Sequence, residues 1–182
     1  MITNTELERK GDLYPVNIID VKREGDSIFF HCENSVILKL TVFRDSLIRF
    51  RFTTKGYFNN DFSYAIDENH SRGFNKLELD EDADFYKVIT SKIVCHISKK
   101  DLRHSIYDLD GNAILEDELG FHWEEIYEYG GNVVKMSKVS KDGESFYGLG
   151  DKATHLNLKG KRLENWATDQ YAFSKDQEPL YK

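Results

Sequence analysis

The chain has 182 residues, which is enough for one domain with a well-buried core. Its formal net charge of −7 argues against nucleic acid or an anionic membrane as the main partner, because association would begin against repulsion. No basic segment followed by an apolar stretch opens the sequence, and no run approaches the roughly 18 apolar residues of a membrane helix. We therefore expect a soluble, cytoplasmic protein without a signal peptide and with a neutral partner.

The composition favours β-structure. Aromatic residues make up 13% of the chain, Pro15 and Pro179 are its two prolines, and β-branched and aromatic residues cluster in short runs. Such residues fit a pleated sheet better than a helix bundle, so an all-β domain is expected. Cys32 and Cys95 lie inside apolar alternating runs, which predicts two reduced, buried thiols rather than a disulfide or a metal pair.

The first half of the chain contains three predicted strands. Residues 1–14 form a polar lead-in that is expected to be flexible. From Ser27 on, apolar side chains recur at every second residue, so that Ile28 and Phe30 share one face. In LIRFRF the arginines likewise face away from the aromatic rings. The predicted strands are residues 27–32, 36–43 and 47–52.

The second half continues as hairpins. Residues 53–84 lack a clean periodicity and are predicted as loops with one short strand around Leu77. Asp110-Gly111-Asn112 accepts positive φ between two apolar stretches, which indicates a hairpin over residues 105–117. Up to ten strands at short spacings, without a convincing helix, favour an antiparallel sandwich. The other predicted elements are a hairpin of residues 85–90 and 92–99, a turn at 130–132 and a strand over 133–140.

Most side chains that could do chemistry are scattered. No two of the six histidines have the spacing that brings ligands together on a metal, so no metal site is predicted. FYGLGD, residues 146–151, lacks the third glycine and the following helix of a nucleotide loop, so no cofactor is predicted. No pair of carboxylates and no Ser-His-Asp set stands out as catalytic.

The segment LENWATDQYAF, residues 163–173, is the exception. Trp166, Tyr171 and Phe173 flank Asp169 and Gln170. Flat aromatic faces suit the C–H surface of a pyranose, and carboxylate and amide groups suit its hydroxyls, so the loop Trp166–Phe173 is a candidate sugar site. The alternative is a loop that is packed by its own aromatic side chains.

Four sequence pieces in this region resemble a known family. They are F-Y-G-L-G followed by an acidic residue, L-N-L-K-G-K, N-W-A-T-D and P-L-Y-K, all within residues 146–182. In this order they resemble the end of the N-terminal β-sandwich of glycoside hydrolase family 31, the α-glucosidase and α-xylosidase family. The resemblance implies an antiparallel, galactose mutarotase-like supersandwich over residues 15–182, ending just before a catalytic (β/α)₈ barrel.

The resemblance also implies roles. Both catalytic aspartates of the family lie in the barrel, so no catalytic residue and no hydrolysis are expected from this chain alone. By position, Asp169 would bind sugar hydroxyls near the +1 subsite, with Trp166, Thr168 and Tyr171 as weaker neighbours. Some relatives have arginine at the position of Thr168, which leaves sugar specificity open. Asp151 replaces the glutamate that is usual after G-L-G, and this shorter carboxylate could shift the partner of the turn. The parent enzyme would cleave an α-linked oligosaccharide or α-glucoside with retention, and the sandwich would pack on its barrel.

Two alternatives from other classes remain. A stand-alone carbohydrate-binding module would use the aromatic side chains of the tail to bind glycan unaided. A free-standing aldose 1-epimerase would share the supersandwich, but it needs a His and Glu constellation on the concave face that the sequence does not locate.

Overall fold

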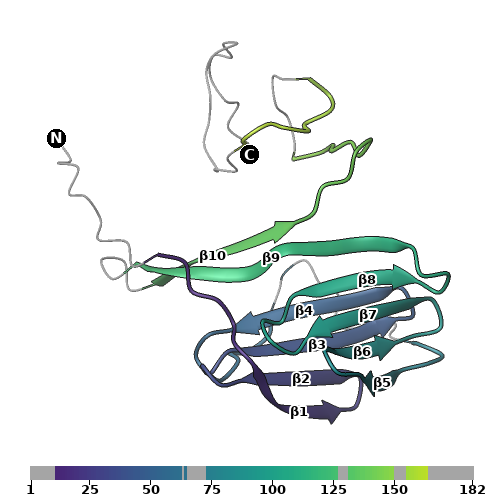
Figure 1. Cartoon of the computed structure of the whole chain (residues 1–182). Coiled ribbons are helices and arrows are strands. Elements are labelled where there is room, and N and C mark those ends of the chain that lie inside the picture. Colours follow the sequence, from purple (N-terminus) through teal and green to yellow (C-terminus); the bar gives the residue numbers. More distant parts are fainter. Residues whose placement is uncertain (1–10, 63, 65–72, 127–130, 150–154, 164–182) are drawn as a thin grey trace. The chain divides into compact units, whose positions relative to one another are not determined.

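The computed structural model describes residues 11–62, 64, 73–126, 131–149 and 155–163, and within these ranges every regular element is a β-strand. The chain divides into two compact units, Met1–Val139 and Ser140–Lys182. All ten strands belong to the first unit, where they form two sheets (Figure 1). The predicted all-β, antiparallel fold class is confirmed. None of the described residues forms a helix long and apolar enough to span a membrane.

The smaller sheet has the order β1-β2-β3-β4, and neighbouring strands are antiparallel. The larger sheet has the order β10-β9-β8-β7-β6-β5 and is also antiparallel throughout. The strands of the smaller sheet are β1 (Ile18–Glu24), β2 (Ser27–Cys32), β3 (Ile37–Arg44) and β4 (Leu47–Thr53). Those of the larger sheet are β5 (Glu78–Glu81), β6 (Phe85–Ile89), β7 (Ile93–Ser98), β8 (His104–Asp108), β9 (Ala113–Ile126) and β10 (Gly131–Lys138).

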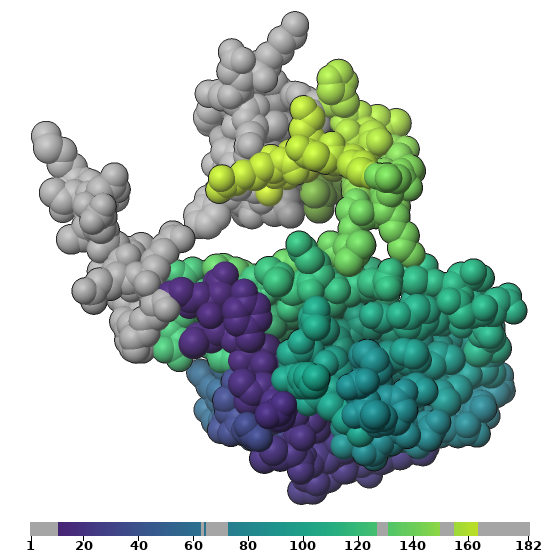
Figure 2. Space-filling model, viewed as in Figure 1, coloured from purple at the N-terminus to yellow at the C-terminus, as the bar shows by residue number. Residues whose placement is uncertain are grey.

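The core lies between the two sheets of the first unit. Alternation directs Phe30 of β2 and Leu38 and Leu40 of β3 inward, and all three are fully buried. The sheets meet through aromatic contacts, because Phe52 of β4 stacks on Phe121 of β9 with ring centroids 4.3 Å apart. On the face shown in the space-filling view, the atoms of the two sheets meet without an open gap (Figure 2).

Most predicted strands are present within one or two residues of their expected ends, and three differences have physical causes. The strand β1 was not predicted, because its charged side chains hide the alternation, as is common for edge strands. The strand β9 continues past Asp117 to Ile126, since Phe121 and Trp123 bury against the core. The predicted turn is wrong at Gly131 and Asn132, which already pair with β9 at the start of β10.

Two further predictions concern the thiols and the termini. Cys32 and Cys95 are free and buried, as predicted, and burial raises the pKa of the Cys32 thiol to about 12.

Within the predicted lead-in, the backbone of Leu13 exchanges hydrogen bonds of 2.7 and 3.0 Å with Trp123. The division into a lead-in over residues 1–14 and one domain over 15–182 stays a prediction.

The described part of the second unit is a loop that is organised around Asn157. Its side-chain oxygen accepts hydrogen bonds from the backbone of Phe146 at 3.1 Å and of Lys159 at 3.0 Å. Its side-chain amide donates to Ser145 Oγ at 3.1 Å. Of the apolar side chains described in this unit, Leu158 alone is buried. The first residue of the FYGLG motif is therefore held by a hydrogen bond to Asn157, eleven residues further along the chain.

Candidate functional site

The residues predicted to bind sugar lie outside the described residues. Trp166, Thr168, Asp169 and Tyr171 all fall in the range 164–182, and Asp151 falls in the range 150–154. The sugar loop therefore stays a prediction. Among the described residues, a group of largely buried polar and charged side chains lies instead on β8, β9 and β10.

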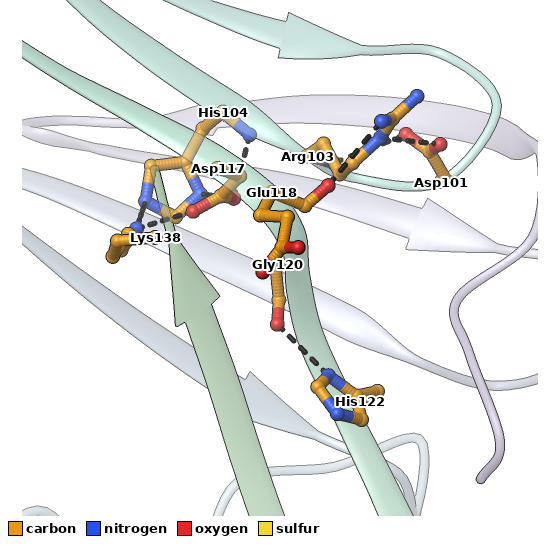
Figure 3. Close-up of polar contacts among 8 residues, drawn as sticks. All are labelled: Asp101, Arg103, His104, Asp117, Glu118, Gly120, His122 and Lys138. Carbon is orange, nitrogen blue, oxygen red and sulfur yellow. Dashed lines mark hydrogen bonds and ion pairs between the residues drawn. The ribbon is translucent and has the colours of Figure 1, made fainter. Parts of the chain in front are cut away.

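A cluster of three side chains joins these strands at the inner face of the larger sheet (Figure 3). His104 begins β8, Asp117 lies in β9, and Lys138 ends β10. The Lys138 Nζ atom lies 2.5 Å from Asp117 Oδ1 and 2.8 Å from His104 Nε2. The side chains of Asp117 and His104 are 1% and 2% exposed, whereas that of Lys138 is 28% exposed. The His104 ring stacks on Phe50 of β4 with centroids 4.1 Å apart.

The contacts assign the proton on the imidazole ring. An ammonium group can only donate, so His104 Nε2 accepts from Lys138 and the proton of the neutral ring resides on Nδ1. That nitrogen lies 2.9 Å from Asp117 Oδ2, but it is buried without an aligned hydrogen bond. The same oxygen accepts the backbone N–H of His104 at 2.9 Å. The cluster therefore holds one carboxylate, one ammonium and one neutral imidazole.

The charge of Asp117 is maintained by its partners. Burial by itself would raise the pKa of this carboxyl, but contacts with His104 and Lys138 outweigh burial and hold the pKa below its usual value. Because Asp117 and His104 are closed off from solvent, no substrate can reach them. The arrangement is suited to hold strands together and not to transfer protons to a sugar.

A glycine-containing bulge places Asp117. Between Ser137 and Lys138 the partner on β9 changes from Gly120 to Asp117, so that two residues of β9 bulge out. Gly120 has φ of 66°, and a Cβ atom there would lie 2.8 Å from Asp117 Oδ2. Both the positive φ and the close approach require glycine at this position.

Gly120→Ala should therefore destabilise the chain by about 2 kcal/mol, through the positive φ and the displacement of Asp117. Gly111→Ala is a matched control, because Gly111 has φ of 85° but nothing lies within 4 Å of its Cβ position. Urea denaturation of both variants measures the difference. Equal losses for the two variants would show that the contact with Asp117 has no energetic effect.

A second polar group lies on the opposite face of β9. His122 and Glu124 are both buried there. His122 stacks on Tyr14 with centroids 5.2 Å apart, and Lys135 Nζ lies 3.2 Å from Glu124 Oε2 and also binds the carboxylate of Asp12. This is a His and Glu pair on one strand, but it is not open to a sugar in the structure. The epimerase alternative gains no support from it.

The role of His104 was not predicted from the sequence. Residues 104 and 106 share a strand face, and Ile106 packs against the core, so the alternation of β8 directs His104 inward. The alternation of side chains along β8 could therefore have predicted that His104 is buried. It could not predict the register of β9 and β10 that brings Asp117 and Lys138 to the imidazole ring. Among the described residues, no three His, Cys, Asp or Glu side chains are placed to hold a metal ion.

Comparisons of the sequence with known proteins also cover the C-terminal residues 164–182, which lie outside the described residues. A family model described as the glycosyl hydrolase 31 N-terminal galactose mutarotase-like domain matches residues 37–182. The chain is 25% identical over 155 residues to Alpha-glucosidase 2 of Bacillus thermoamyloliquefaciens, which covers 84% of this chain and 19% of that protein. The chain therefore spans about one fifth of this curated relative.

Solved structures share the fold. A GH31 dextranase of Flavobacterium johnsoniae, complexed with isomaltotriose, superposes with a TM-score of 0.75 at 22% identity, covering 93% of this chain and 20% of that chain. A GH31 alpha-xylosidase of Xanthomonas citri superposes with a TM-score of 0.66 at 22% identity, covering 78% of this chain and 16% of that chain. These similarities agree with a galactose mutarotase-like sandwich.

Proposed function

Because this chain belongs to the glycosyl hydrolase 31 N-terminal galactose mutarotase-like domain family, we propose that it is the N-terminal domain of a longer, retaining α-glycosidase. In that enzyme the sandwich packs on a catalytic barrel, and the loop Trp166–Phe173 completes the sugar-binding pocket. The substrate is an α-linked oligosaccharide or an α-glucoside.

The observation that carries this proposal is the extent of the family match. The match runs from residue 37 to residue 182 and so includes both the sandwich and the motif-bearing tail with Asp169. The relatives add a substrate class, since they include an alpha-glucosidase and a dextranase solved with isomaltotriose. The match over residues 37–182, and not a single motif, supports the assignment.

We assign the chemistry to the barrel and recognition to the sandwich. Retaining hydrolysis needs two carboxyl groups about 5 Å apart that face the bond to be cleaved. In the described residues the buried carboxylates are already engaged: Asp117 with Lys138, Glu124 with Lys135, and Asp45 with hydrogen-bond donors of Asn75. The chain by itself is therefore proposed to hydrolyse nothing, while Asp169 offers a charged acceptor to sugar hydroxyls.

Titration calorimetry of the 182-residue chain with maltose and isomaltose tests this division of roles. A loop that forms half of a shared pocket should bind with a Kd weaker than about 10 mM, because the contacts do not offset the entropy of association. A stand-alone binding module would instead give saturable heat at sub-millimolar sugar, and that result would contradict the proposal. The longer polypeptide should hydrolyse an aryl α-glucoside and release the α-anomer first, as proton NMR can show.

A further inference from the structure

The last strand of the sandwich ends where the second compact unit begins. Lys138 is the final residue of β10 and Ser140 is the first residue of the second unit, so only Val139 separates them. Within the described part of the chain, β9 is the only strand that pairs with β10. The end of such a one-sided strand is where fraying is expected.

Three contacts hold this end in place. Lys138 Nζ reaches Asp117 Oδ1 at 2.5 Å and His104 Nε2 at 2.8 Å, so one side chain ties β10 to both β9 and β8 (Figure 3). The backbone N–H of Val139 then donates to Glu116 O at 2.9 Å. The side-chain contacts lie within two residues of the boundary between the units.

The burial of Asp117 makes these contacts difficult to release. Its carboxylate is 1% exposed and cannot be hydrated in place. If Lys138 moved into solvent, the buried carboxylate would lose its ammonium partner and keep only its contacts with His104, and such a loss is strongly unfavourable. Fraying of the end of β10 would therefore remove the counter-ion of a buried carboxylate, which costs more than the loss of one exposed ion pair.

We propose that Lys138, held by Asp117 and His104, is a positioning residue that anchors the exit of the chain from the sandwich into residues 140–182. The anchor itself does not depend on the proposed function. Its consequence for sugar recognition does, because Asp169 lies in the segment that leaves from this point.

The same strand offers a matched control. Lys135 lies three residues earlier and on the opposite face of β10, where it binds Asp12 and Glu124. Lys135→Met removes a comparable pair of contacts from β10. These contacts hold Asp12 near the N-terminus, and not the end of β10 where the chain continues into residues 140–182.

Hydrogen exchange of the Val139 amide, followed by NMR on the 182-residue chain, tests the anchor. The Cys32 amide, which donates to Val36 O in the smaller sheet, serves as the reference for global unfolding. In Lys138→Met the rate of Val139 relative to Cys32 should rise by about tenfold or more, and in Lys135→Met it should stay within about twofold of wild type. An unchanged ratio in Lys138→Met, or an equal rise in Lys135→Met, would overturn the proposal.

A double variant covers the case in which Lys138→Met folds poorly. Lys138→Met with Asp117→Asn removes both charges, so no unpaired charge stays buried. The Val139 ratio should remain raised in this variant, and a wild-type ratio would show that the charged cluster is not the anchor.

Kinetics of the longer polypeptide then separate the anchor from the proposed function. Lys138→Met should raise KM for an α-glucoside more than it lowers kcat, because the substrate loop is less well placed. If Asp169→Ala leaves kcat/KM unchanged, the proposed role of the loop Trp166–Phe173 in sugar binding fails, while the exchange experiment still decides the anchor. If Asp169→Ala is impaired but Lys138→Met is not, the positioning role is wrong.

Discussion

Replacing Lys138 with methionine should lower the free energy of unfolding of the chain by about 3 to 5 kcal/mol. Methionine keeps most of the aliphatic volume but removes the ammonium that lies between Asp117 Oδ1 and His104 Nε2. The carboxylate of Asp117 is then buried without its ammonium partner. Urea denaturation near neutral pH measures the loss, and adding Asp117→Asn should recover most of it, because the double variant buries no charge.

The loss should also depend on pH, in the direction set by the pKa of Asp117. In the folded chain this pKa lies below its usual 3.8, so the carboxylate contributes stability above that value and the contribution is lost as the pH falls through the folded pKa. Once Asp117 is protonated it carries no charge, so the absence of the Lys138 ammonium no longer leaves a buried charge unpaired. The difference between wild type and Lys138→Met should therefore be largest near neutral pH and shrink below about pH 4.

Lys22→Met provides the comparison for this measurement. Lys22 pairs with Asp20 at 3.2 Å on the surface, where the two side chains are 62% and 47% exposed. Such exposed pairs contribute less than about 1 kcal/mol. If Lys138→Met cost no more than Lys22→Met, or if its cost did not change with pH, the buried cluster would have no special role in stability.

Alanine in place of Asp169 should lower kcat/KM of the proposed longer glycosidase by tens of fold. A charge-assisted hydrogen bond to a sugar hydroxyl contributes about 1.5 to 3 kcal/mol, which corresponds to a loss of this size. Steady-state kinetics with several α-glucosides measures the effect. Asp169→Asn should retain part of the activity, since the amide oxygen can still accept a hydrogen bond from the sugar.

The control for this variant is the fold of the domain. The thermal unfolding of the 182-residue chain should be the same with and without Asp169→Ala, because the residue is assigned to the pocket and not to the core. An unchanged kcat/KM across the α-glucosides would remove Asp169 from the binding site. A loss of stability as large as the loss of activity would assign it a structural role instead.

The sheet strands were largely predictable because their signal is local. In β2 and β3 the inward side chains Phe30, Leu38 and Leu40 alternate with outward ones, and the structure buries all three. The strand β1 escaped prediction because its charges mask that period, and β9 was cut short at the charged residues that precede Gly120. The sugar loop around Asp169 stays a prediction that rests on family motifs.

By itself the sequence determined the all-β class, the two buried thiols and the family motifs of the tail, since each depends on residues that are close together along the chain. The tertiary structure decided the cluster of His104, Asp117 and Lys138. These residues are up to 34 positions apart, and they meet only because a bulge at Gly120 shifts the register of β9 against β10. The register of a strand depends on all of its cross-strand pairs together, so it cannot be predicted from any single segment of the sequence.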